Sequence, residues 1–304
     1  MPSNSNEGPE VLVEKKGRVG YLTLNRPDRL NAFTVEMLHQ IELGLTEFDE
    51  DDNIAVVVLK GKGRAFCSGK EIGEASAEYF NVTGHRDRKE VNHLGLWFHH
   101  TFWEYRKPVI LQLQGYCYGG ATFFLGVTDL VVAASDTLIG FAESKAFAVE
   151  GTLGGLPLSI GPRWTKALLL TGDAIDAVTA ERIGMINKAV PPEELDEYTD
   201  WLAARIARSD TSLLALHKQM VNSVYDALGL YAALKAGLAH GHMEHREDTF
   251  QEFMRRVQDD GVKSALDWAY APVGGKQTRG MPTFLDGPRA EREWVAKKNK
   301  ATVR

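Results

Sequence analysis

The chain has 304 residues, 44% of them hydrophobic and 25% charged, with a formal net charge of −6. This composition is ordinary for a globular protein with a real core, and its negative charge disfavours bulk binding to nucleic acid. The chain has only two cysteines, and its polar N-terminus lacks the apolar segment of a signal peptide. No apolar run approaches the ~20 residues of a membrane span. We therefore expect a cytoplasmic protein with no membrane contact.

The N-terminal part begins with residues 1–9, which we expect to be disordered. Two strands are predicted at 11–13 and 19–24. Thr34 can then cap a helix whose apolar face is spaced at helical intervals: Met37, Ile41, Leu45 and Phe48. Residues 54–59 form a continuous apolar run, typical of a strand buried on both faces, and 65–67 should start another strand.

The middle of the chain alternates helices and strands. We expect a helix over 91–105, a strand over 109–113, a turn at the pair Gly119–Gly120, a short apolar helix over 121–127 and a strand over 130–134. The histidines of the first helix, His93, His99 and His100, are more simply explained by helix packing than by metal binding. No metal site is predicted.

Helices dominate the C-terminal part. They are expected at 163–170, 177–183, 193–207, 212–228, 230–258 and 261–268, with one short strand at 186–190. The overall class is α/β with a helical C-terminal part. We divide the chain into a core at 10–192, a helical region at 193–270 and an extended basic tail at 271–304.

The stretch from Gly115 to Glu143 suggests chemistry. A strand that leads through Gly119 and Gly120 into a helix presents N–H groups without partners in the helix, and glycine lets a ligand approach the backbone. The stretch closes on one carboxylate, Glu143. Donors for an oxyanion together with one acid/base group form a minimal proton-transfer site.

Several short motifs recur in the order found in one known family. They include Leu24–Pro27 with Asn31–Ala32, Gly63–Gly69, Lys107–Ile110, Gly115–Tyr116 through Gly119–Gly120, Asp129, and Leu170–Asp173 through Ala180, Gly184 and Val190–Pro191. With these residues, the chain resembles the crotonase superfamily of enoyl-CoA hydratases, isomerases and their relatives over residues 10–260.

The resemblance implies a spiral of ββα turns and C-terminal helices that form a homotrimer or a hexamer. It implies an acyl-CoA substrate, with coenzyme A bound as part of the substrate and no other cofactor. The thioester oxygen of an enolate would be held by the backbone N–H groups of Ser68 and Gly120. Glu143 would be the catalytic acid/base.

One departure from the family is important. A typical hydratase of the family uses two glutamates. The first lies three residues after the second glycine of the pair, and here that residue is Phe123. Relatives with a single carboxylate include enzymes that hydrate and cleave aryl-enoyl-CoA thioesters. A lyase or isomerase acting on a bulky or aromatic enoyl-CoA is therefore the leading hypothesis.

Other residues are assigned by the same resemblance. Phe123, Lys70, Tyr231 and Glu150 are candidates for the substrate pocket, and Arg26, Arg29 and Lys70 are candidates for the CoA phosphates. Two alternatives remain open: a β-diketone C–C hydrolase that works without CoA, which should carry a histidine near Glu143, and a non-catalytic acyl-CoA-binding subunit, which the absence of the first carboxylate permits.

Overall fold

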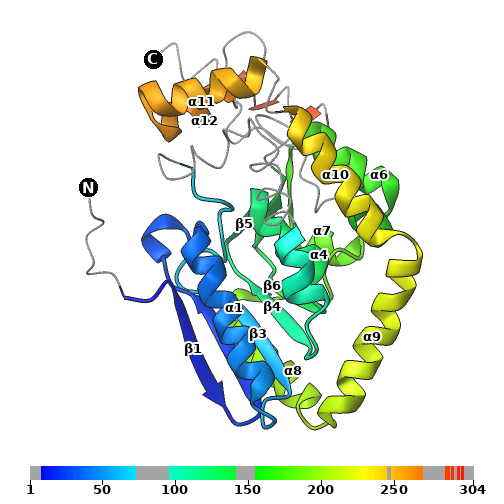
Figure 1. Cartoon of the computed structure of the whole chain (residues 1–304). Coiled ribbons are helices and arrows are strands. Elements are labelled where there is room, and N and C mark those ends of the chain that lie inside the picture. Colours follow the sequence, from blue (N-terminus) through cyan, green and yellow to red (C-terminus); the bar gives the residue numbers. More distant parts are fainter. Residues whose placement is uncertain are drawn as a thin grey trace.

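The computed structural model describes residues 8–72, 96–141, 155–244 and 248–269, together with a few positions between 285 and 297. Most of the helices and strands of these segments are arranged around one large sheet, and the two helices over 248–269 lie apart from it (Figure 1). No helix in the described parts of the chain is both long and apolar enough to cross a bilayer.

The main sheet has six strands in the order β1-β2-β3-β4-β6-β9. They are β1 (Val11–Lys16), β2 (Val19–Leu24), β3 (Val56–Gly61), β4 (Val109–Leu113), β6 (Leu130–Ala134) and β9 (Lys188–Val190). β1 and β2 form an antiparallel hairpin, and all the other neighbours are parallel. A small second sheet joins β5 (Tyr116–Tyr118), β7 (Leu138–Gly140) and β8 (Ala174–Asp176).

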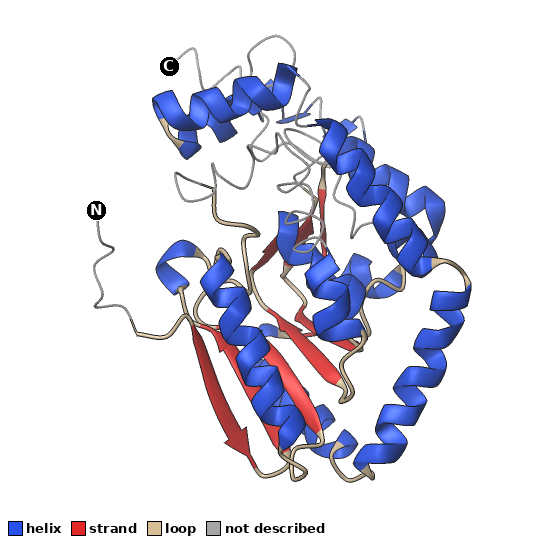
Figure 2. Ribbon diagram, in the orientation of Figure 1, coloured by secondary structure: helices blue, strands red, loops and turns tan. Residues whose placement is uncertain are grey.

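Each face of the main sheet buries its own apolar cluster, because side chains alternate along a strand. On one face, α1 (Val35–Glu50) lies over β1 and β2, as Figure 2 shows. The strand side chains of this cluster include Leu59 and Leu111. On the other face, α8 (Leu195–Ile206) contacts β3, β4 and β6 and packs on Val58 and Ile110.

The remaining helices connect or follow the strands. They are the 3-10 turns η1 (Pro27–Arg29), η3 (Gly119–Thr122) and η5 (Pro192–Glu194), the π-helix η2 (His99–Trp103), and the α-helices α4 (Phe123–Val127), α6 (Leu156–Thr171), α7 (Ala177–Arg182), α9 (Thr211–Ala227), α10 (Leu230–Glu244), α11 (Asp248–Asp260) and α12 (Val262–Ala269). In Figure 1, α9 runs along one edge of the molecule, and α10 continues upward from its end at an angle.

Most predicted elements are present, and a few differ from the prediction. The Thr34 hydroxyl accepts from the N–H of Met37, so the predicted cap of α1 is confirmed. Residues 65–67 form no strand but a single bridge between Cys67 and Cys117. The helix predicted over 230–258 is described as α10 and α11, with 245–247 outside the described residues. The start of the helix predicted from residue 91 also lies outside them.

Candidate functional site

The first loop of the candidate site turns at Gly69. Its φ of 98° lies in the left-handed region that favours glycine. The Gly69 N–H donates to the Cys67 Sγ at 3.3 Å, and the Gly69 carbonyl accepts from the N–H of Phe33 at 2.9 Å. The N–H of Glu71 donates to the Phe33 carbonyl at 3.0 Å. These bonds place Lys70 opposite Phe33 in a parallel bridge and fix the backbone direction at Lys70.

The second loop leads from β5 through Gly119 and Gly120 into α4. Gly119 has a φ of 55°, and its carbonyl accepts from the Thr122 hydroxyl at 2.7 Å. Gly120 therefore lies in the first turn of a helical segment, where N–H groups have no partner in a preceding turn. The predicted strand–glycine–helix arrangement is confirmed.

The two loops approach one another so closely that both turns require glycine. A Cβ at Gly69 would lie 3.1 Å from the backbone nitrogen of Gly120 and 2.8 Å from the Tyr118 carbonyl oxygen. A Cβ at Gly120 would lie 2.9 Å from the Phe33 ring and 3.5 Å from the backbone nitrogen of Lys70. The fold thus brings the backbone nitrogens of Lys70 and Gly120 close together.

The predicted role of Ser68 as an oxyanion donor is wrong. Its N–H donates to the carbonyl of Leu30 at 3.0 Å and is committed to that bond. Gly69 adopts a left-handed φ, and the backbone nitrogen that lies beside Gly120 is that of Lys70, two residues after Ser68. The sequence shows a glycine at this point but not its φ, which decides which neighbouring N–H lies beside Gly120.

An aromatic wall lines the start of α4. We use this name for Phe33, Trp97, Phe98, Phe123 and Phe124. The Phe123 side chain, in a residue only 8% exposed, meets the Phe98 ring edge-on at 5.2 Å between centroids. The Phe33 ring, 5.9 Å from that of Phe98, is the ring that a Cβ at Gly120 would strike. Where a typical hydratase has a carboxylate, this chain has packed aromatic rings.

The comparisons with known proteins agree with this geometry. The family model described as enoyl-CoA hydratase/isomerase matches residues 14–260. The chain belongs to the enoyl-CoA hydratase/isomerase family. A protein of Dictyostelium discoideum, "Probable enoyl-CoA hydratase, mitochondrial", is 33% identical over 216 residues, which cover 70% of this chain and 76% of that protein.

Solved structures show the same fold. An enoyl-CoA hydratase/isomerase from Xanthobacter autotrophicus Py2 has a TM-score of 0.77 at 27% identity, with 86% of this chain and 97% of that chain covered. An enoyl-CoA hydratase from Mycobacterium smegmatis has a TM-score of 0.80 at 23% identity, with 88% and 96% covered. The predicted crotonase-like fold is confirmed, and the helical C-terminal region is present.

Two predicted family residues cannot be placed. Glu143 and Glu150 belong to the segment 142–154, which lies outside the described residues. The described chain stops at Phe141, immediately after β7, and β7 is paired with β5, the strand that leads into Gly119. Glu143 is two positions after Phe141 in the sequence, and its role remains a prediction.

Arg26 was predicted to meet the CoA phosphates, but its contacts favour a structural role. Its Nη2 lies 3.0 and 3.2 Å from the two carboxylate oxygens of Glu71, and its Nε lies 3.2 Å from Glu10. Its Nη1 donates to the Ala32 carbonyl at 2.6 Å. The guanidinium is thus surrounded by acceptors of its own chain.

Three other predicted residues occupy different places. Lys70 is half-buried, with its backbone beside Gly120. Arg29 is exposed at the end of η1. Tyr231 lies at the start of α10, with its ring 5.3 Å from that of His99. The structure therefore brings Lys70 to the loops of the site, whereas the Tyr231 ring contacts His99 and His100 of the π-helix and Lys235 of α10.

Asn31 is a site residue whose function sequence reasoning did not assign. It is fully buried, with a φ of 53°, and its Nδ2 donates to the carbonyls of Lys62 and Ala65 at 2.9 Å each. Its Oδ1 accepts from the Arg26 N–H at 2.8 Å. Asn31 thereby ties the Arg26 turn to the loop that precedes Gly69. The sequence signal for Asn31 was its place in the motif Asn31–Ala32 that follows Leu24–Pro27.

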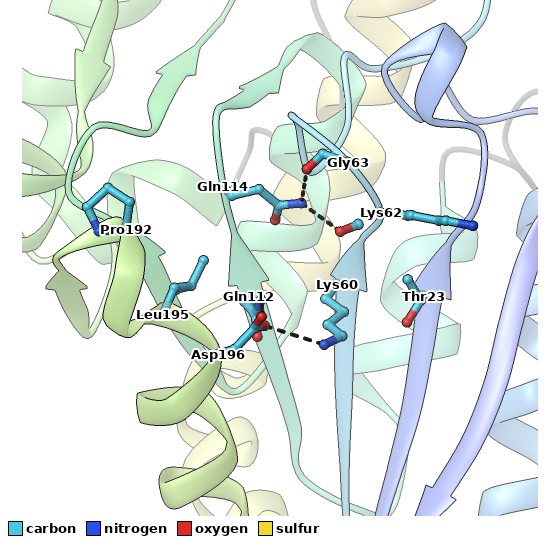
Figure 3. A pocket seen from close by; sticks show the side chains of 10 residues that line it. Thr23, Lys60, Lys62, Gly63, Gln112, Gln114, Pro192, Leu195 and Asp196 are labelled. Carbon is cyan, nitrogen blue, oxygen red and sulfur yellow. Dashed lines mark hydrogen bonds and ion pairs between the residues drawn. The ribbon is translucent and has the colours of Figure 1, made fainter.

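A separate hollow of about 390 Å³ lies on the α8 face of the main sheet, shown in Figure 3. Its polar side chains pair with one another: Asp196 accepts from Gln112 at 2.8 Å and lies 3.4 Å from the Lys60 Nζ. The strand neighbours of these residues, Leu59 and Leu111, face the opposite cluster with the aromatic wall. The hollow is therefore distinct from the loops at Gly69 and Gly120. Within the described residues, no group of three or more His, Cys, Asp or Glu could hold a metal ion.

Proposed function

We propose that this enzyme stabilises the enolate of an enoyl-CoA thioester with the backbone N–H groups of Lys70 and Gly120. The supporting observation is the approach of the two loops, in which a Cβ at Gly120 would lie 3.5 Å from the Lys70 nitrogen. Backbone donors fixed before the reaction are effective because they need no reorganisation as charge develops on the thioester oxygen. Loss of one such donor typically lowers turnover about 10²–10³-fold.

The proton transfer is assigned to Glu143. With the thioester oxygen held at the two amides, this carboxylate would remove a proton from, or return one to, the substrate carbon next to the thioester. A positioned carboxylate contributes about 10²–10⁴-fold to such a step. Phe123 replaces the first carboxylate of a typical hydratase, so water is not activated there.

The aromatic wall suggests the class of acyl group. Phe33, Phe98 and Phe123 form an apolar edge-to-face cluster beside Gly120, which favours an aryl or bulky acyl chain over a short polar one. We therefore propose isomerase or hydratase-lyase chemistry on an aryl or bulky enoyl-CoA. Arg29 and Lys70 remain the candidate contacts for the CoA phosphates.

The test is a panel of aliphatic and aryl enoyl-CoA thioesters, with products identified by mass spectrometry. The native chain should convert a bulky or aryl member fastest. Glu143→Gln should lower its turnover at least ~10²-fold while acyl-CoA binding persists, because the amide keeps the size of the side chain but cannot take the proton. Unchanged turnover in Glu143→Gln would remove Glu143 from the mechanism.

Two other functions predict different results. Binding of CoA should weaken as salt is added, because phosphates meet cationic side chains. If calorimetry at low salt detects no binding of CoA or acyl-CoA, a CoA-independent β-diketone hydrolase becomes the better hypothesis. If acyl-CoA binds but no thioester in the panel reacts, the chain is an acyl-CoA-binding subunit.

A further inference from the structure

The Arg26 side chain joins three segments of the chain. Its Nε contacts the carboxylate of Glu10 at 3.2 Å, its Nη1 donates to the carbonyl of Ala32 at 2.6 Å, and its Nη2 contacts both oxygens of Glu71 at 3.0 and 3.2 Å. The exposed fractions of the side chains of Arg26, Glu10 and Glu71 are 14%, 22% and 33%. This arrangement uses the planar fork of arginine, which lysine cannot reproduce.

The two acceptors, Ala32 and Glu71, are sequence neighbours of the residues that form the parallel bridge beside Gly120. Ala32 precedes Phe33 in the chain, and Glu71 follows Lys70. Phe33 and Lys70 are the bridge partners, held by the bonds from the Phe33 N–H to Gly69 and from the Glu71 N–H to Phe33. Arg26 therefore clamps the Phe33 segment to the Lys70 segment beside the bridge.

The clamp bears directly on the distance between the two loops. The Phe33 ring packs against Gly120, and the Lys70 nitrogen lies beside the same glycine. Gly120 lies between β5 and α4, and β5 is bonded to Cys67, on the side of Gly69 away from Lys70. If the Glu71 end of the loop moves, the Lys70 N–H therefore moves relative to Gly120. A displacement of about 1 Å far from the chemistry can lower turnover by about 10²-fold.

We propose that Arg26, acting through Glu71 and the Ala32 carbonyl, is a positioning residue that fixes the Lys70 N–H relative to the Gly120 N–H. This inference rests on the proposed function, since the two amides are the oxyanion donors of that proposal. It assigns Arg26 no contact with CoA. The side chain acts through the geometry of the backbone and touches no reacting atom.

The experiment compares Arg26→Gln, Arg26→Lys and Glu71→Gln with the native full-length chain. We expect kcat to fall about 10–100-fold in Arg26→Gln and Glu71→Gln, with Arg26→Lys retaining more activity than Arg26→Gln because it keeps a cation near Glu71. The Kd of acyl-CoA should change less than about threefold, because no phosphate contact is lost. Hydrogen exchange should become faster in the peptide that contains Lys70 and Glu71.

The matched control is Arg106→Gln. Arg106 also contacts a carboxylate and a carbonyl, both of Asp49, but on the exposed end of α1. The Arg106→Gln variant should have the kcat of the native chain and the same rate of hydrogen exchange near Lys70. Melting temperatures separate a displaced loop from general unfolding, and Glu71→Gln serves as the second variant if Arg26→Gln does not fold.

A double-mutant cycle gives the sharpest result. If Arg26 acts through Glu71, then Arg26→Gln combined with Glu71→Gln should have a kcat close to that of the worse single variant, because both remove one interaction. Fully additive losses, an unchanged kcat, or a main effect on acyl-CoA affinity would overturn the proposal. Hydrogen exchange near Lys70 measures the effect of Arg26 without any need for turnover. If the native chain were inactive towards every thioester, the proposed function would be refuted, and hydrogen exchange would still test the role of Arg26.

Discussion

The short helix α4 and the long helix α9 are stabilised in opposite ways. α4 has five residues, and Phe123, Phe124 and Val127 among them are buried. α9 has 17 residues, and none of its apolar residues is buried. Leu214 and Tyr225 pack partly against core clusters of the same chain. The other large apolar side chains are 51–65% exposed: Leu213, Leu216, Met220, Val221 and Val224, with Leu228 just after the end of the helix.

The difference shows which apolar side chains one subunit can bury by itself and which it leaves exposed. The rings around α4 exclude water within a single subunit, so the position of Gly120 is set by the chain itself. The apolar face of α9 has no cover of its own in the described chain and is large enough to indicate a contact surface. This agrees with the predicted homotrimer or hexamer, which remains a prediction.

The largest expected effect comes from introducing a charge beside α4. Phe123→Glu should lower the free energy of unfolding by about 3–5 kcal/mol from the loss of the ring alone, and burial of an unpaired carboxylate adds to this. Urea denaturation measures the change, and Phe123→Leu is the control, with a clearly smaller loss. A well-folded Phe123→Glu variant with at least tenfold faster crotonyl-CoA hydration would show an ordinary hydratase site that lacks one group.

An intermediate effect is expected on α9. The paired substitutions Leu216→Glu and Met220→Glu should dissociate the oligomer, because both side chains belong to the exposed apolar face. Each should change the stability of the isolated subunit by no more than about 0.5 kcal/mol, since neither is buried in it. Light scattering measures the mass.

The control on α9 is Ser223→Glu, in which a polar residue on the same helix is replaced. Its mass should remain that of the native protein. A native mass near the 33.7 kDa of one chain would contradict the prediction of an oligomer outright.

The smallest effect concerns His99, which lies between the two regions. Its buried ring stacks on Trp103 and contacts Tyr231 of α10. Burial lowers the pKa of His99 below its ordinary value of 6.5; Glu104 and Asp226 act to raise it, whereas His100 lowers it further. The folded state therefore resists protonation, and the stability that His99 contributes is present above pH 6.5 and lost as the pH falls below it.

The measurement is the urea midpoint between pH 7.5 and 5. The native chain should lose stability over this range, with a contribution from His99 of at most about 1.4 kcal/mol per pH unit, the limit for one proton. His99→Asn should show a shallower dependence. An identical pH dependence in the two proteins would show that His99 titrates alike in the folded and unfolded chain.

The sequence predicted those features that depend on local pattern. The face Met37, Ile41, Leu45 and Phe48 and the cap at Thr34 specified α1, because periodicity and capping act over a few residues. The buried strand near 54–59 was found for the same reason, although β3 is described two residues later, at Val56–Gly61. The family was evident from the order of its motifs.

The features that failed depend on backbone angles and distant partners. The choice between Ser68 and Lys70 depended on the φ of Gly69 and on the bond from the Ser68 N–H to Leu30. The contacts of Arg26 depend on Glu71, which lies 45 positions away in sequence but in contact in space. A formal charge in a motif does not reveal whether its partner is a ligand or a carboxylate of the same chain.

The contacts of Lys218 bear on the rate constant with which subunits would associate. Its side chain is only 6% exposed, and its ammonium contacts Asp129 at 2.9 Å and donates to the Phe102 carbonyl at 2.9 Å. These contacts anchor the middle of α9 to η2 and to the residue before β6. α9 is thus seated on its own subunit before any partner arrives. Association would then be docking of preformed surfaces, with the typical rate constants of about 10⁵–10⁷ M⁻¹s⁻¹, rather than folding coupled to binding.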